Sequence, residues 1–231
     1  MFIEKRRFEN SRGLSLAAIY KGENRDAPTV MLCHGYGSSK DSVSQKDLRR
    51  KLIESGFCVF IFDFTGCGES EGTIEDLVPS NGLDDLKSAI TNLGRKEFAL
   101  HGGSFGGYVA LLYASQNPVL VLSLKCPVSD YPEILRLRDD EERPSRDKIL
   151  KETADISLYQ KAKNIKCPAL IVHGDADDIV PLNQSRKLLI SLGSKEKELK
   201  IIKGAPHTMR GKPMEEAHNK IANFLKRILL K

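Results

Sequence analysis

The residues best suited to chemistry are a serine and a histidine, each placed directly after an apolar run. Ser104 stands in the pattern Gly102-x-Ser104-x-Gly106. This pattern predicts a nucleophile elbow, a sharp turn from a strand into a helix that exposes the serine hydroxyl. A serine needs a histidine as base, and the histidine needs an acid to orient it. His207 follows the apolar residues 199–202 and is the candidate base.

The candidate acids lie between these two residues in the chain. Asp175, Asp177 and Asp178 all follow the apolar run 169–172, and spacing alone does not choose among them. The order serine, acid, histidine, each after a strand, places all three at the sheet edge where ligands bind in open α/β folds. The sequence therefore predicts a Ser–His–Asp triad that attacks a carbonyl carbon.

The elements that position these residues alternate between strands and helices. Strands are expected at 29–33, 57–62, 98–100, 119–124, 169–172 and 199–202, and helices at 41–55, 83–93, 109–115, 183–192 and 212–230. The strands are almost continuously apolar, which indicates a mostly parallel central sheet with helices on both faces. Residues 2–8 and 14–20 are expected to form an antiparallel hairpin at its edge.

The length of 231 residues suits a single α/β domain spanning 1–231. Residues 127–166 interrupt the alternation and are expected to form a short lid or cap insertion. Its part 131–152 carries seven acidic and six basic residues. We expect its apolar side chains to cover a pocket from above; they are Ile134, Leu135, Leu137, Ile149 and Leu150.

Three further motifs support one family. Residues 34–37 (HGYG) resemble an HGxG oxyanion loop, 63–70 (DFTGCGES) a DxxGxGxS turn, and 174–181 (GDADDIVP) a GxxDxxVP acid loop. Together with the elbow, they make the chain resemble the serine hydrolases of the α/β-hydrolase superfamily. It is most similar to the branch of feruloyl and cinnamoyl esterases, monoacylglycerol lipases and serine aminopeptidases of the S33 type. The resemblance implies the α/β-hydrolase fold.

The resemblance also assigns roles. Ser104 is the nucleophile, His207 the base and Asp177 the acid, while the backbone N–H groups of Tyr36 and Phe105 form the oxyanion hole. The Tyr36 ring either faces the pocket or packs. The implied activity is cleavage of carboxylic esters with small or compact acyl groups through an acyl-enzyme intermediate. The alternatives are an aminopeptidase, an acyl-peptidase or a thioesterase with the same triad, and a non-catalytic hydrolase-fold binding protein.

Composition and residue spacing exclude several classes of binding partner. The net charge of +5 is spread along the chain, so no nucleic-acid partner is expected, and no apolar run is long enough for a membrane span. The five cysteines lack a CxxC pair and no histidines have metal-ligand spacing, so we expect no metal and no cofactor. We expect the protein to be cytoplasmic. His173 is expected to be hydrogen-bonded, His34 to be structural and His218 to be exposed. The sequence does not predict an oligomer.

Overall fold

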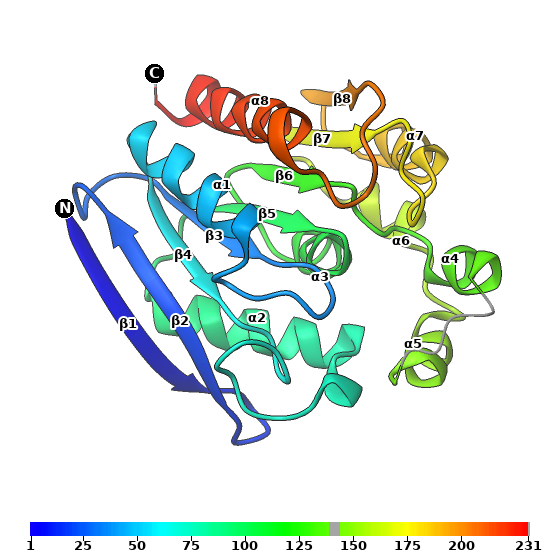
Figure 1. Cartoon of the computed structure of the whole chain (residues 1–231), viewed down its shortest axis with the longest axis horizontal. Coiled ribbons are helices and arrows are strands. Elements are labelled where there is room, and N and C mark those ends of the chain that lie inside the picture. The colour runs from blue at the N-terminus through cyan, green and yellow to red at the C-terminus, as the bar shows by residue number, and fades with distance from the viewer. Residues whose placement is uncertain (139–143, 231) are drawn as a thin grey trace.

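The computed structural model describes residues 1–138 and 144–230 and contains one eight-stranded sheet (Figure 1). The strands are β1 (Phe2–Glu9), β2 (Ser15–Gly22), β3 (Thr29–Cys33), β4 (Cys58–Phe62), β5 (Ala99–Gly103), β6 (Leu122–Lys125), β7 (Ala169–Gly174) and β8 (Lys197–Ile202). They lie in the order β1-β2-β4-β3-β5-β6-β7-β8. β1 and β2 pair antiparallel, which confirms the predicted hairpin, and β2 runs antiparallel to β4. The remaining neighbours are parallel.

Helices cover both faces of the sheet, as predicted. They are α1 (Val43–Glu54), α2 (Pro79–Leu93), α3 (Phe105–Ala114), α4 (Tyr131–Leu137), α5 (Arg146–Thr153), α6 (Leu158–Ala162), α7 (Leu182–Ser191) and α8 (Gly211–Leu229), with a short 3₁₀ turn η1 at Ile74–Asp76. α1 and α8 pack together over one face (Figure 1). α2, α3 and α7 pack on the other. All residues of β3, β4, β5 and β7 are buried, which explains why these strands contain no Asp, Glu, Lys or Arg.

Two helices begin earlier than the sequence pattern predicts. α2 begins at Pro79 rather than residue 83, because proline suits the first turn of a helix and Gly82 is used for packing. A Cβ at Gly82 would lie 2.9 Å from the Phe105 ring, so the glycine allows α2 to approach α3 closely. α3 begins at Phe105 rather than residue 109, directly after the elbow.

The carboxyl ends of the parallel strands meet at one edge of the sheet. Segments that leave β3, β5, β6, β7 and β8 there carry residues 34–37, Ser104, Lys125, Asp177 and His207. Strands 99–103 and 122–125 are direct neighbours, with Gly103 in register with Lys125. The fold therefore gathers residues from five separate strand ends; the sequence analysis expected this of the triad residues and of 34–37, but not of Lys125.

The described parts of the predicted lid, 127–138 and 144–166, contain α4, α5 and α6. Residues 139–143, four of them acidic, lie outside the described residues. Ile134, Leu135 and Ile149 are buried in the core beneath α4 and α5, whereas Leu137 and Leu150 are exposed. Figure 1 shows α4 and α5 beyond the strand ends, away from β1 and β2. No described helix is long and apolar enough to span a membrane.

Candidate active site

Ser104 occupies the turn between β5 and α3 in a backbone conformation that side chains rarely adopt, with φ 52° and ψ −116°. Such conformations cost on the order of 1–3 kcal/mol, and the neighbouring packing must hold them. Here two glycines let the backbone close up. A Cβ on Gly102 would lie 2.3 Å from the Gly106 carbonyl oxygen, and a Cβ on Gly106 would lie 2.3 Å from that of Cys33. The local sequence thus forms the tight elbow that exposes the Ser104 hydroxyl.

His207 lies against this serine. Its Nε2 is 3.0 Å from Ser104 Oγ, and its Nδ1 is 2.8 Å from Asp177 Oδ2. An ionised carboxylate only accepts hydrogen bonds, so Nδ1 carries the hydrogen and donates a hydrogen bond to Asp177. Nε2 is then the acceptor for the Ser104 hydroxyl. The loops after β5, β7 and β8 therefore bring together one member each of the predicted triad.

Four N–H groups face the buried Asp177 carboxylate, and one of them, from His173, is shared with the Val180 carbonyl oxygen. Oδ1 accepts from the backbone N–H of Ile179 at 2.9 Å and of Val180 at 2.7 Å. Oδ2 faces both His207 and His173, whose Nε2 lies 3.1 Å away. Burial alone raises the pKa of Asp177, but the hydrogen bonds from the two histidines outweigh it and hold that pKa well below its usual range. Asp177 is therefore an ionised carboxylate in a fixed position.

His173 supports the acid rather than the nucleophile. Its Nδ1 lies 2.7 Å from Ser185 Oγ, and its Nε2 lies 2.9 Å from the Val180 carbonyl oxygen. The expectation that His173 is hydrogen-bonded is confirmed. Its ring, the Cys126 thiol and Asp177 place potential metal ligands within 4.8 Å of one another. Burial raises the pKa of Cys126 to about 12, so its thiol stays protonated, and both His173 nitrogens are already used. These three side chains are therefore accounted for by hydrogen bonds within the acid loop and do not form a metal site in this structure.

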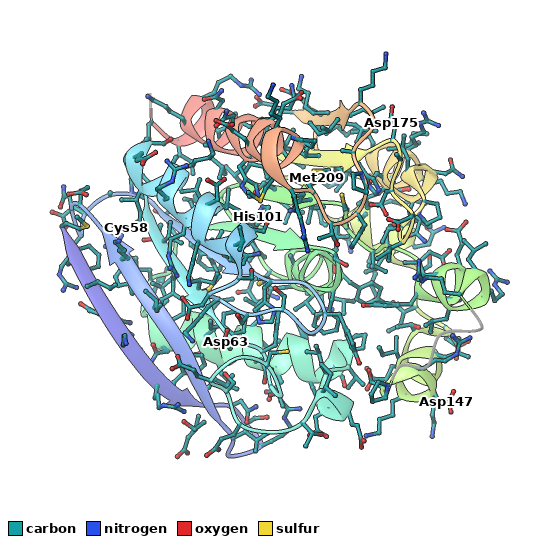
Figure 2. All side chains as sticks on the ribbon, in the orientation of Figure 1. Cys58, Asp63, His101, Asp147, Asp175 and Met209 are labelled. Carbon is teal, nitrogen blue, oxygen red and sulfur yellow. The ribbon has the colours of Figure 1, made fainter. Side chains whose placement is uncertain are left out.

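The other two aspartates of the loop have different contacts. Asp175 accepts from the backbone N–H of Gly204, and Figure 2 labels it at the rim near α7. Asp178 accepts from the backbone N–H of His207 at 3.5 Å. Both side chains accept hydrogen bonds from the segment that carries His207, but neither forms a hydrogen bond with the His207 imidazole. The choice among the three aspartates, which spacing left open, therefore follows from where the side chains point.

The loop after β3 lies beside the nucleophile. A Cβ on Gly35 would be 3.4 Å from Ser104 Cβ, so this loop borders the elbow. The Tyr36 ring contacts the Phe105 ring edge-on, with 6.3 Å between centroids, and its hydroxyl is 2.7 Å from Ser145 Oγ. Tyr36 therefore packs and lines the pocket at once. The backbone N–H groups of Tyr36 and Phe105 have no acceptor in the described part of the chain, as donors awaiting an oxyanion would.

A cavity of about 190 Å³ opens beside Ser104 and His207. Its wall is formed by Gly35, Tyr36, Ser38, Ser42, Ser44, Gln45, Gly103, Ser104, Lys125, Cys126, His207, Thr208 and Met209. None of the apolar lid side chains expected to cover a pocket lines this cavity. Burial has turned three of them into the core instead, as described above.

Two further sequence motifs are structural. His34 donates from Nδ1 to the Gly35 carbonyl oxygen at 2.8 Å, and its Nε2 accepts from the Phe64 N–H at 3.1 Å. Asp63, labelled in Figure 2, is fully buried and accepts from the ammonium of Lys40 at 2.7 Å and the backbone N–H of Glu69 at 2.9 Å. These residues hold the DxxGxGxS turn against the oxyanion loop.

The expectation for His218 was wrong. Its side chain is fully buried, and Nδ1 lies 2.7 Å from Asp47 Oδ2. The signal was present in the sequence, since His218 lies four residues after Met214 and three before Ile221, on the apolar stripe of α8. Sequence reasoning also missed Lys125 and Ser44, which line the cavity beside Ser104.

Comparisons with known proteins agree with this geometry. The family model of the alpha/beta hydrolase fold matches residues 28–130, and that of serine aminopeptidase, S33, matches residues 148–213. Bovine palmitoyl-protein thioesterase ABHD10, a mitochondrial protein, is 24% identical over 84% of this chain and 71% of its own length. YfhR of Escherichia coli is 28% identical over 79% of this chain and 64% of its own length.

Solved structures share the whole fold. The ferulic-acid complex of Est1E from Butyrivibrio proteoclasticus superposes with a TM-score of 0.86 at 20% identity, covering 98% of this chain and all of that one. The esterase Pf2001 of Pyrococcus furiosus superposes with a TM-score of 0.81 at 21% identity, covering 99% and 93%. With the two family models, the eight-stranded sheet and the elbow after its fifth strand, these findings show that the chain has the α/β-hydrolase fold.

Proposed function

We propose that this protein is a serine hydrolase that cleaves carboxylic esters of small or compact acyl groups through an acyl-enzyme intermediate. The observation that carries the proposal is the hydrogen-bonded series Ser104–His207–Asp177, with 3.0 Å and 2.8 Å between its polar atoms, beside an open cavity. Nucleophile and base at this distance satisfy the geometric requirement for covalent catalysis.

The reaction follows from the proton positions. Ser104 Oγ attacks the carbonyl carbon while His207 Nε2 takes its proton, which leaves His207 protonated beside the Asp177 carboxylate. The tetrahedral oxyanion accepts hydrogen bonds from the N–H groups of Tyr36 and Phe105. The intermediate collapses as His207 protonates the departing alcohol, and an acyl-Ser104 ester remains. Water then repeats the sequence, with His207 again as base, and releases the acid.

The proposal is tested most directly with a fluorophosphonate probe, which reacts only with an activated serine. We expect the probe to label Ser104 and Ser104→Ala to abolish labelling. The same variant is expected to lose ester hydrolysis by on the order of 10⁶-fold in kcat, since a triad without its nucleophile retains little activity. Absent labelling of a folded wild type would favour a non-catalytic binding protein. Near-native turnover in Ser104→Ala would overturn the assignment.

A thioesterase is the second candidate, and the bovine relative's name favours it. Palmitoyl groups need more apolar surface than the cavity beside Ser104 offers. A second hollow of about 490 Å³ shares Ser38, Ser42, Ser44, Thr208 and Met209 with the first and adds the apolar side chains of Val43 and Met214. Parallel assays with matched acyl esters, acyl thioesters and aminoacyl amides separate esterase, thioesterase and aminopeptidase activity.

The proposal also covers the domain bounds, the cofactor requirement and the cellular compartment. We regard 1–231 as one hydrolase domain and 127–166 as its short lid, which the hydroxyl contact between Tyr36 and Ser145 supports. Hydrolysis by this triad requires no metal and no cofactor. The five cysteines are free thiols, which supports a reducing compartment such as the cytoplasm. The substrate is a small ester, amide or thioester, with no nucleic acid and no stable membrane association in the proposal.

A further inference from the structure

A lysine and the first turn of a helix form the cavity wall on the side of α1. Lys125, the last residue of β6, accepts a hydrogen bond from the Ser104 N–H at its carbonyl oxygen, at 3.0 Å. Its backbone is therefore fixed relative to the nucleophile. Its side chain lines the same cavity as Ser104 and His207, and its ammonium lies 3.0 Å from Ser44 Oγ.

The Lys125 ammonium begins a series of hydrogen bonds in which each group donates to the next. Lys125 can only donate, so Ser44 Oγ accepts from it. The Ser44 hydroxyl then donates to His218 Nε2, 3.3 Å away, and His218 Nδ1 donates to Asp47 at 2.7 Å. Burial lowers the pKa of His218 to about 4, so the imidazole is neutral, as this direction requires. One of the three Lys125 donors is spent, and two remain for the cavity.

Among the described residues, the ammonium of Lys125 has no directly paired carboxylate. Asp47 already pairs with Arg50 at 2.8 Å, besides its contact to His218. Burial lowers the pKa of Lys125, because the charged form has lost water and the nearby Asp47 carboxylate compensates only in part. An anion in the cavity would complete that compensation.

The second positive element is the N-terminus of α1. Ser42 is the N-cap, and Ser42, Ser44 and Gln45 from the first turn all line the cavity. The first turn of this 12-residue helix contains no acidic residue, and in the described ranges the N–H groups of Val43 and Ser44 have no acceptor. A helix N-terminus attracts anions and repels cations. An ammonium pointing at one is unfavourable unless an anion lies between them.

Gln45 provides an independent sign that the cavity has a polar occupant. Its side chain is only 6% exposed and lines the cavity, and its Oε1 is buried without a hydrogen-bond partner. Buried polar atoms in folded proteins are nearly always paired, so this unpaired acceptor beside the cavity calls for a hydrogen-bond donor such as a water molecule, which can in turn donate to an anion. Figure 2 labels Met209, which lines the same cavity from the segment before α8.

We infer that this side of the cavity is a subsite for a carboxylate, and that the preferred substrates are esters carrying a free carboxylate a few atoms from the scissile bond. The inference rests on the proposed function and specifies its substrate class. The carboxylate would lie between the Lys125 ammonium and the first turn of α1. Neighbouring strands are about 4.8 Å apart, so the short separation follows from Lys125 and Ser104 lying on adjacent strand ends.

Two substrate pairs distinguish the acyl side from the leaving-group side. In the first pair, monoethyl glutarate is compared with the ethyl ester of glutaramic acid, where a neutral amide replaces the acyl-side carboxylate. In the second, 4-acetoxybenzoate is compared with 4-acetoxybenzamide, where the change is in the leaving group. We expect kcat/KM of the carboxylate to exceed that of its amide at least tenfold in one of the pairs. Ratios near one in both pairs would overturn the inference.

Variants assign the preference to Lys125. Lys125→Met keeps the chain length and removes the charge, and we expect it to lower the carboxylate-to-amide ratio at least tenfold, mainly through KM. Lys203→Met is the matched control, because it removes an exposed charge from the His207 loop outside the cavity. Its ratio is expected to stay within twofold of wild type. A ratio retained in Lys125→Met, with Ser104 still labelled by fluorophosphonate, would refute the subsite.

A binding measurement separates failure of the subsite from failure of the proposed function. Calorimetric titration of the wild type with glutarate and with 4-hydroxybenzoate requires no turnover. Binding that is lost in Lys125→Met but not in Lys203→Met supports the subsite even if no ester is cleaved. An active esterase that binds neither anion, or binds them equally well in both variants, would contradict the inference and leave the proposed function intact.

Discussion

Replacing Asp177 by asparagine tests the proposed mechanism at one atom. Asp177 Oδ1 accepts two backbone hydrogen bonds, from Ile179 and Val180, whereas Oδ2 faces His207. An asparagine in this position keeps its oxygen toward the two N–H groups, because an NH₂ there would meet two donors. Its NH₂ then faces His207 Nδ1 and donates to it.

This reversal moves the proton of the imidazole. With Nδ1 as acceptor, the neutral ring carries its hydrogen on Nε2, which points at Ser104 Oγ and no longer accepts the serine proton. A triad with the wrong tautomer is expected to lose about 10⁴-fold in kcat. At about 1.36 kcal/mol for each tenfold change, this equals about 5.4 kcal/mol of transition-state stabilisation.

The assay is kcat for p-nitrophenyl acetate, together with the rate of fluorophosphonate labelling of Ser104. Asp175→Asn and Asp178→Asn are the matched controls, since the side chain of each aspartate accepts from a backbone N–H of the His207 segment and not from the imidazole. We expect each control to lose less than about 10²-fold, well short of the loss from the wrong tautomer. The reasoning is refuted if Asp177→Asn keeps a tenth of the wild-type rate, or if either control falls as far.

Two further predictions concern substrate length and acid stability. Across p-nitrophenyl esters from two to sixteen carbons, we expect kcat/KM to be highest for short acyl chains. Each buried methylene contributes ~0.8 kcal/mol to binding, but the cavity of about 190 Å³ has no room for the methylenes of a long chain. A maximum at twelve or more carbons would favour a lipase or a long-chain thioesterase. Burial holds the pKa of His218 at about 4 against ~6.5 in the unfolded chain, so the unfolded state binds more protons below pH 6.5. His218 alone should therefore lower the free energy of unfolding by about 1.4 kcal/mol for each pH unit from 6.5 toward 4, and His218→Gln should remove that part of the slope in urea titrations at pH 5, 6 and 7. A wild type that becomes more stable between pH 6.5 and 5 would contradict this sign.

The sequence predicted where most strands lie in the chain, because burial on both faces leaves a nearly uninterrupted apolar run. It was less accurate for the ends of elements. The expected strand 119–124 begins only at Leu122, where pairing with Leu100 starts, and Leu120 lies partly exposed before it. α2 was missed at its start because Pro79 and Gly82 are typical of turns, although here one begins the helix and the other packs it against α3.

The candidate triad could be located in advance because each member follows its own strand within a short motif. Choosing Asp177 over its neighbours depended on resemblance, since three adjacent carboxylates differ only in where the backbone directs them. Lys125, Ser44 and His218 carry no local motif at all. They come from β6, α1 and α8, and only the packing of α1 against α8 brings them together.

The two hydrogen-bonded series beside the cavity begin alike and end differently. In each, a carboxylate accepts from a histidine Nδ1, and the Nε2 of that histidine faces a serine hydroxyl: Asp177, His207 and Ser104 in one, Asp47, His218 and Ser44 in the other. The first ends at a serine in a strained turn that lines the cavity, where the proposed function makes it the nucleophile. In the second, Lys125 donates to the serine oxygen, which lowers its nucleophilicity and fixes the ammonium. Under the proposed function and the inferred subsite, the same chemical series supplies a nucleophile on one wall and, on the other, a fixed positive charge that favours an anionic substrate.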